Sequence, residues 1–260
     1  MVVLSVAVPE GERDQVVADL WEAGTCGIIE GEHLRAFFED EAAARRAAER
    51  LAAYEPFLEP AEEKDWVAES RAAFPPIEVG DRLFLAPYWS DAATPAGRLR
   101  LTTYPGAAAG TGQHPTTQLC LRALERVIFD GARVLDVGCG SGILSAGAKL
   151  LGAGVIFGCD IDHAATRIAR DNLRAEGIPA ALFTGSVRSV RPRSVDIAVA
   201  NLNAATLVEI AYPLSASAKT LVLSGFRTWE APRVQSAFRK PAQCLEQEDW
   251  SCLIIQSTSH

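Results

Sequence analysis

A glycine loop directly after an apolar segment constrains this chain more than any other feature. Val134-Leu135-Asp136-Val137 predicts a buried strand, and Gly138-Cys139-Gly140-Ser141-Gly142 follows it. The apolar positions from Ile143 onward predict a helix. Glycine lets the backbone turn sharply and approach a ligand closely, and the start of a helix presents free N–H groups. The segment is therefore typical of a strand–loop–helix unit that binds a nucleotide-like ligand.

Strand and helix patterns alternate from about residue 114 to the end of the chain. We expect helices to fill the gaps between strands, for example at 143–151 and 164–176. The expected strands are 133–137, 155–159, 180–184, 196–200 and 221–224, with a late pair near Cys244 and at 252–255. Such alternation predicts a mostly parallel sheet with helices on both faces. The expected fold class is therefore α/β, with a Rossmann-like sheet in a domain at 76–260.

The first 60 residues have a different pattern. Strand, helix, strand, strand, helix and strand are expected in turn, at 2–8, 11–22, 26–30, 33–38, 40–53 and 54–60. This order predicts a small ferredoxin-like α+β domain at 1–60. A helical linker is expected at 61–75, ended by Pro75-Pro76. Two short strands at 82–86 and 98–102, with Pro and Gly between them, predict a hairpin.

Composition and charge narrow the class of protein. The 260 residues carry a net charge of −8, which disfavours a nucleic-acid surface and suits a basic partner. No run of eighteen apolar residues is present, so we expect no membrane segment. The N-terminus lacks signal-peptide features, and the six cysteines show no zinc-type spacing, so a cytoplasmic protein without a metal site is expected.

Acidic side chains flank the glycine loop. Asp136 lies two positions before Gly138 in a GxGxG pattern that also contains Gly140, and we expect it to hold the loop or a ligand ammonium group. Asp160 ends the next strand, 22 residues after Gly138, where a carboxylate accepts hydrogen bonds from ribose hydroxyls. A nicotinamide dinucleotide would use Asp160 in the same way. Asp162 is expected to cap the following helix.

Two further segments supply polar groups. Asn201 ends an apolar strand, where its amide can orient an amine substrate, or alternatively can cap the helix expected near Ala204. The segment 110–119 contains a glycine turn that opens a helix, and Thr117 and the helix N–H groups suit a carboxylate. His114 in this segment is a candidate for either a structural role or a catalytic base.

These segments, in this order, resemble the bacterial methyltransferases of large-subunit ribosomal protein eleven (the PrmA type), within the class I S-adenosylmethionine-dependent methyltransferases. The matching segments are Gly110 to Thr117, Gly138 to Gly142, Asp160 to Asp162 and Ala200 to Leu202. The resemblance extends over nearly the whole chain.

The resemblance implies a cofactor, a substrate and site residues. It implies S-adenosylmethionine bound at Thr117, Gly138, Asp160 and Asn201, to which the loop adds Asp136 and Gly140. It implies methylation of lysine side chains, and of the N-terminal amine, on a basic ribosomal large-subunit protein. The small N-terminal domain would recognise that substrate. We expect a monomer without direct nucleic-acid contact, in which Asn201 and His114 are the candidate catalytic residues.

The chain departs from the family pattern in places. Tyr104 stands where the family has Asp, Ala109 where it has Phe, and Leu202-Asn203 where amino-methyltransferases often have prolines. These changes bear on the substrate more than on the cofactor. Alternatives are therefore a methyltransferase acting on another protein or small-molecule amine, a cofactor-binding homologue without catalysis, and a nicotinamide-dependent dehydrogenase.

Overall fold

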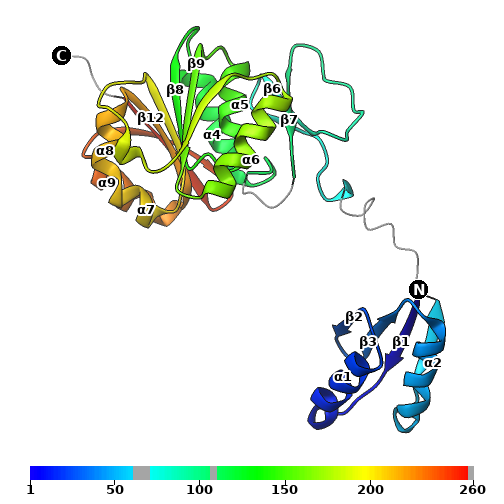
Figure 1. Cartoon of the computed structure of the whole chain (residues 1–260). Helices are drawn as coiled ribbons and strands as arrows, with labels where there is room; N and C mark the ends of the chain where they lie inside the picture. The colour runs from blue at the N-terminus through cyan, green and yellow to red at the C-terminus, as the bar shows by residue number, and fades with distance from the viewer. Residues whose placement is uncertain (61–70, 106–109, 257–260) are drawn as a thin grey trace. The chain divides into compact units, whose positions relative to one another are not determined.

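The computed structural model describes residues 1–60, 71–105 and 110–256 (Figure 1). The chain divides into two compact units, Met1–Ala72 and Ala73–His260. Most of the expected helical linker, at 61–70, lies outside the described residues. Within the described ranges, no helix is both long and apolar enough to cross a membrane. Each unit is described separately below.

The N-terminal unit is a four-stranded antiparallel sheet with two α-helices. The elements in chain order are β1 (Val2–Val6), η1 (Glu10–Glu12), α1 (Arg13–Glu22), β2 (Gly27–Glu30), β3 (Leu34–Phe38), α2 (Glu41–Arg50), η2 (Ala52–Tyr54) and β4 (Phe57–Pro60). The sheet order is β2-β3-β1-β4, and every neighbouring pair is antiparallel. Leu4, Leu20 and Phe38 are fully buried in its core. The expected ferredoxin-like arrangement is confirmed.

The second unit begins with a three-stranded sheet in which one expectation is wrong. The strands are β5 (Ile77–Val79), β6 (Leu83–Pro87) and β7 (Leu99–Thr103). The hairpin is formed by β5 and β6, whereas β6 and β7 pair in parallel. Arg98 donates to the carbonyls of Gly80 and Leu83, both at 3.0 Å. Arg100 likewise donates to backbone carbonyls of the returning loop, and these long-range bonds replace a tight hairpin turn.

A seven-stranded sheet forms the centre of this unit. Its strands are β8 (Arg133–Val137), β9 (Val155–Asp160), β10 (Ala180–Thr184), β11 (Ile197–Asn201), β12 (Thr220–Arg227), β13 (Ala242–Gln247) and β14 (Trp250–Gln256). The order is β10-β9-β8-β11-β12-β14-β13, and only the pairs made by β14 are antiparallel. The expected Rossmann-like sheet is confirmed. The strand order reverses between β8 and β11, where ligands of such sheets bind.

Helices cover both faces of the sheet (Figure 1). Leu121, Leu144 and Leu173 bury one face, and Leu207, Leu214 and Val234 bury the other. They belong in turn to α4 (Pro115–Val127), α5 (Ile143–Leu150), α6 (His163–Ala175), α7 (Ala204–Glu209), α8 (Ala211–Ser217) and α9 (Ala231–Phe238). The short helices η3 (Val187–Ser189) and η4 (Thr228–Glu230) follow β10 and β12. Because both faces are covered, the open part of the sheet is its carboxyl edge.

Candidate active site

A cavity of about 680 Å³ lies at the carboxyl edge of β8, β9 and β11. This volume is within the range of small-molecule sites. Of the predicted cofactor residues, Gly138, Gly140, Asp160 and Asn201 line it. Its apolar wall is supplied by Val137, Ile161, Ile168, Val187, Leu202 and Ile210. The cavity thus combines the glycine loop, a carboxylate and an amide with an apolar surface wide enough for an aromatic base.

Asp160 connects β9 to the glycine loop. Its Oδ2 accepts a hydrogen bond from the backbone N–H of Gly140 at 3.0 Å, and its Oδ1 accepts one from that of Asp162 at 3.0 Å. Each carboxylate oxygen can accept a second hydrogen bond. Asp160 is therefore held rigidly and can still accept from ligand hydroxyls. Asp162 caps α6 by accepting from the N–H of Ala164 at 2.8 Å, as predicted.

Asp136 lies behind the loop and is 1% exposed. Its Oδ2 accepts from the Ser145 N–H at 3.0 Å and from the Ser145 hydroxyl at 2.7 Å. Gly142, at the N-cap of α5, has no side chain to cap the helix, so Asp136 does so from β8. Burial raises the pKa of Asp136 to about 6, against the lowering effect of the Ser145 hydrogen bonds.

The two carboxylate oxygens of Asp136 differ in their hydrogen bonding. Its Oδ1 is buried and has no hydrogen-bond partner among the described residues. A buried acceptor without a donor is unfavourable unless a ligand or water supplies one. Asp136 does not line the cavity, so its direct effect is to hold the start of α5.

Asn201 ends β11 with its amide beside α4. Its Nδ2 donates to Thr117 Oγ1 at 3.4 Å, and its Oδ1 accepts no hydrogen bond from a described residue. The alternative capping role is wrong for Asn201, because Asn203 caps α7 by accepting from the Thr206 N–H at 2.9 Å. The side chain of Asn201 is therefore available at the switch point of the sheet.

Thr117 and His114 both lie at the start of α4 but contact different groups. Thr117 is 2% exposed and reaches Asn201 rather than the cavity. His114 is the N-cap of α4: its Nδ1 lies 2.8 Å from Thr116 Oγ1 and accepts from the Thr116 N–H at 3.3 Å. Its ring packs edge-on against Trp250 at 4.7 Å. These contacts match the structural alternative for His114, and His114 does not line the cavity.

Contacts around Tyr104 and Gly110 tie the preceding segment to the cofactor loop. Ser141 Oγ donates to the carbonyl of Gly110 at 2.7 Å. The Tyr104 hydroxyl donates to Glu176 at 2.5 Å, and burial, with this hydrogen bond, raises the pKa of Tyr104 to about 12. Ala109, the other departure, lies outside the described residues. Tyr104 thus has a defined contact of its own in place of the family's Asp.

Two site features were missed by the sequence analysis. Ser145 binds Asp136, and the signal for it was its place three residues after Gly142, where capping partners occur. Arg188 forms an ion pair with Glu209 at 3.1 Å, and both residues line the cavity. No spacing rule predicts this pair, because 21 residues separate its members.

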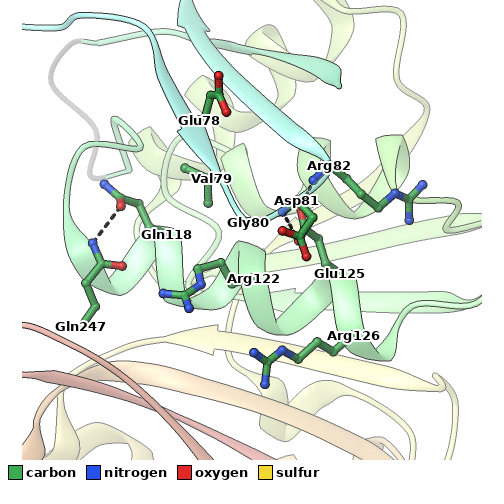
Figure 2. A pocket seen from close by; sticks show the side chains of 10 residues that line it. All are labelled: Glu78, Val79, Gly80, Asp81, Arg82, Gln118, Arg122, Glu125, Arg126 and Gln247. Atoms are coloured by element: carbon green, nitrogen blue, oxygen red, sulfur yellow. Dashed lines mark hydrogen bonds between the residues drawn. The ribbon is translucent and has the colours of Figure 1, made fainter. Parts of the chain in front are cut away.

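A second cavity, of about 460 Å³, lies between α4 and the β5–β6 turn (Figure 2). Two of its acidic groups have structural partners: Glu125 accepts from the N–H groups of Asp81 and Arg82, both at 3.0 Å, and Glu78 pairs with Arg98 at 2.7 Å. None of the predicted cofactor residues lines it. The candidate active site is therefore the cavity at the sheet edge.

Comparison with known proteins decides the family. The sequence model of the family "Ribosomal protein L11 methyltransferase (PrmA)" matches residues 4–258. The chain belongs to this family. The ribosomal protein L11 methyltransferase of Neisseria gonorrhoeae is 38% identical over 219 residues, covering 83% of this chain and 72% of that protein. That of Neisseria meningitidis serogroup C is 34% identical over 252 residues, covering 94% and 83%.

A solved structure agrees with the family assignment. The crystal structure of a ribosomal protein L11 methylase from Lactobacillus delbrueckii subsp. bulgaricus superimposes with a TM-score of 0.64 at 26% identity. The match covers 71% of this chain and 99% of that one. The predicted family and class of enzyme are confirmed, and the dehydrogenase alternative is wrong. The enzyme is a methyltransferase with S-adenosylmethionine as its cofactor.

The cavity fits this cofactor by its chemistry. Asp160 offers carboxylate oxygens of the kind that bind ribose hydroxyls, and Ile161 and Val187 offer apolar surface for adenine. Gly138 and Gly140 bring backbone, without side chains, to the cavity wall.

Proposed function

We propose that this enzyme transfers methyl groups from S-adenosylmethionine to amino groups of ribosomal protein L11, both lysine side chains and the N-terminal amine. One observation carries this proposal beyond family membership: the Asn201 amide ends a cavity-lining strand with its Oδ1 uncommitted, because Asn203 has taken over the helix cap. An uncommitted amide oxygen is the group needed to accept an N–H from an incoming amine.

The cofactor would be held by groups from three strand ends. Asp160 would accept from the ribose hydroxyls, and the backbone at Gly138 and Gly140 would face the methionine part. Asp136 and Thr117 would contribute without touching the cofactor. Asp136 would fix the start of α5, and Thr117 would fix the amide of Asn201. The bound sulfonium supplies a methyl group that is already activated toward nucleophiles.

The protein's remaining task is to present a neutral amine. A free lysine has a pKa of about 10.4, so its deprotonation at pH 7 costs about 4.6 kcal/mol. An apolar surrounding lowers an amine pKa, and Leu202 and Ile210 supply apolar surface beside Asn201. Accepting one N–H at Asn201 Oδ1 would then aim the lone pair, which is mainly a positioning effect.

His114 remains a candidate base through Nε2 alone. Its Nδ1 is engaged by Thr116, whereas Nε2 has no hydrogen-bond partner in the described part of the chain. We propose that capping α4 is its first role, because those contacts are made without any substrate.

The net charge and the family support a proposal for the partner and its compartment. We propose a basic segment of L11 as the substrate, attracted by a chain of net charge −8, in the cytoplasm and without direct nucleic-acid contact. We further propose that residues 1–60 recognise the substrate, that residues 61–75 link the two parts, and that residues 76–260 catalyse the reaction as a monomer.

A second candidate is a methyltransferase of another amine substrate. Tyr104 favours it, because this residue replaces the family's Asp and is bonded to Glu176 near the glycine segment. The two are separated by offering L11 and unrelated basic proteins in parallel with labelled cofactor. Transfer confined to L11 supports the first candidate, and transfer to another protein or small amine with L11 unmodified supports the second.

A further inference from the structure

Leu202, the residue after Asn201, lies between two glycines that are far apart in the sequence. A Cβ added at Gly138 would lie 2.6 Å from the Leu202 side-chain atom Cδ2. A Cβ added at Gly225 would lie 2.5 Å from the Leu202 carbonyl oxygen and 2.7 Å from its backbone nitrogen. Such distances are below those of any ordinary carbon contact. The absence of both side chains therefore makes the slot in which Leu202 sits.

The two contacts of Leu202 differ in how easily the contacting atoms can move aside. At Gly138 the contact is the end of a flexible side chain, whereas at Gly225 it is the backbone of Leu202 itself. The Leu202 N–H also donates to the carbonyl of Ser224 at 2.9 Å, and Ser224 pairs with Asn201 in the sheet register. The backbone that follows Asn201 is thus pressed against β12 and bonded to it.

The local backbone of β12 is shaped for this contact. Gly225 has φ of +99°, and the pairing of β12 with β14 is irregular between Leu223 and Phe226. An interruption of this kind is a bulge, and a left-handed glycine is its usual residue. The bulge interrupts the regular pairing of β12 with β14 at the point where the Leu202 backbone lies against Gly225.

We propose that Gly225 is a positioning residue for methyl transfer. Resting on the function proposed above, it fixes the Leu202 backbone, and through it the Asn201 amide, relative to the glycine loop that carries Gly138. Gly225 touches neither substrate nor cofactor in this account, since it does not line the cavity. Its effect is on geometry at Asn201, where displacements near 1 Å reduce rates by about 100-fold.

The test compares Gly225→Ala with Gly131→Ala. Gly131 has φ of +84° and nothing within 4 Å of an added Cβ, so its variant carries similar backbone strain without the clash. For Gly225→Ala we expect kcat to fall by about 30-fold or more, with the Kd of S-adenosylmethionine, measured by calorimetry, within about threefold of wild type. Gly131→Ala should keep kcat within about threefold, since strain alone acts on stability.

Two further measurements keep the proposal testable. Hydrogen exchange of the segment 200–206, followed by mass spectrometry, should be faster in Gly225→Ala than in Gly131→Ala, and it is readable even if L11 is not the substrate. Should Gly225→Ala fail to fold, Leu202→Ala keeps the backbone contact with Gly225 and removes only the side chain, which lines the cavity. Its segment 200–206 should then exchange as slowly as in wild type, whatever happens to its kcat. Unchanged kcat in folded Gly225→Ala, exchange in that variant no faster than in Gly131→Ala, or fast exchange in Leu202→Ala would overturn the positioning role.

Discussion

Asn201 donates a hydrogen bond to Thr117 at 3.4 Å although 84 residues separate the two in the sequence. This bond joins the end of β11 to the first turn of α4 and turns the amide so that Nδ2 is used and Oδ1 is not. The two amides of this short segment differ, because Asn203 caps α7 while Oδ1 of Asn201 is uncommitted, and we propose that it receives the substrate amine.

Truncating the two asparagines should therefore affect different properties of the enzyme, kcat in one case and stability in the other. Asn201→Ala should lower kcat by about 100-fold with little change in thermal stability, since it removes a positioning group. Asn203→Ala should instead lower the free energy of unfolding by about 1 kcal/mol, since it removes a helix cap. Steady-state kinetics and chemical denaturation of both variants check this. Normal turnover in Asn201→Ala would rule out its assigned role.

Asp160 should control cofactor affinity rather than turnover. Asp160→Ala removes the proposed ribose acceptor and also the acceptor of the Gly140 N–H. We expect the Kd of S-adenosylmethionine to rise at least about tenfold, equivalent to about 1.4 kcal/mol of binding free energy. Calorimetry measures this directly, with Asp171→Ala as the control, because Asp171 is an exposed carboxylate of α6 that does not line the cavity. Equal affinity in wild type and Asp160→Ala would refute the assignment.

Asp136 should make stability depend on pH in the mildly acidic range. Its folded-state pKa of about 6 lies above the ordinary value of 3.8, so the folded protein takes up a proton before the unfolded chain does. Stability from this group is therefore present at low pH and is lost as pH rises through about 6. The difference is about 2 kcal/mol between pH 4 and pH 7.

The Asp136→Asn variant isolates that contribution. We expect the difference in unfolding free energy between wild type and variant to change by this amount across the range, as measured by denaturant titrations at several pH values. A difference that does not vary with pH would mean that Asp136 is not ionising in the folded protein as described.

His114 should matter more for stability than for chemistry. His114→Ala removes the acceptor for the Thr116 N–H at the start of α4 and should lower the free energy of unfolding by about 1 kcal/mol. The kcat should change by far less than the 100-fold or more expected for loss of a general base. His114→Asn, which can still cap, should recover stability. A 100-fold loss of kcat in both variants would show instead that the imidazole itself takes the proton.

Local sequence patterns predicted the parts of the fold that local physics determines. The strand at 133–137 and its glycine loop follow from an apolar run and from glycine's freedom, and β8 has these bounds. Asp160 was predicted from its place at the end of a strand, because the carboxyl ends of parallel strands meet at one edge.

Long-range contacts decide what the patterns could not. Proline and glycine between 82–86 and 98–102 indicated a loop but not its direction, and Arg98 and Arg100 hold that loop in a parallel crossover. Asn201 and Asn203 have the same side chain two positions apart, so only the structure shows which one caps α7. The pairing of Asp136 with Ser145 and of Arg188 with Glu209 likewise arises from the folded arrangement.

The most direct test of the central claim is methyl transfer to ribosomal protein L11 of the same organism, read by intact mass. Wild-type enzyme with S-adenosylmethionine should add mass in steps of one methylene to L11, and Asn201→Ala should do so about 100-fold more slowly. Calorimetry with the same preparation reports cofactor binding independently. Tight cofactor binding with no mass gain on L11 would contradict the proposed substrate and direct the search to another amine.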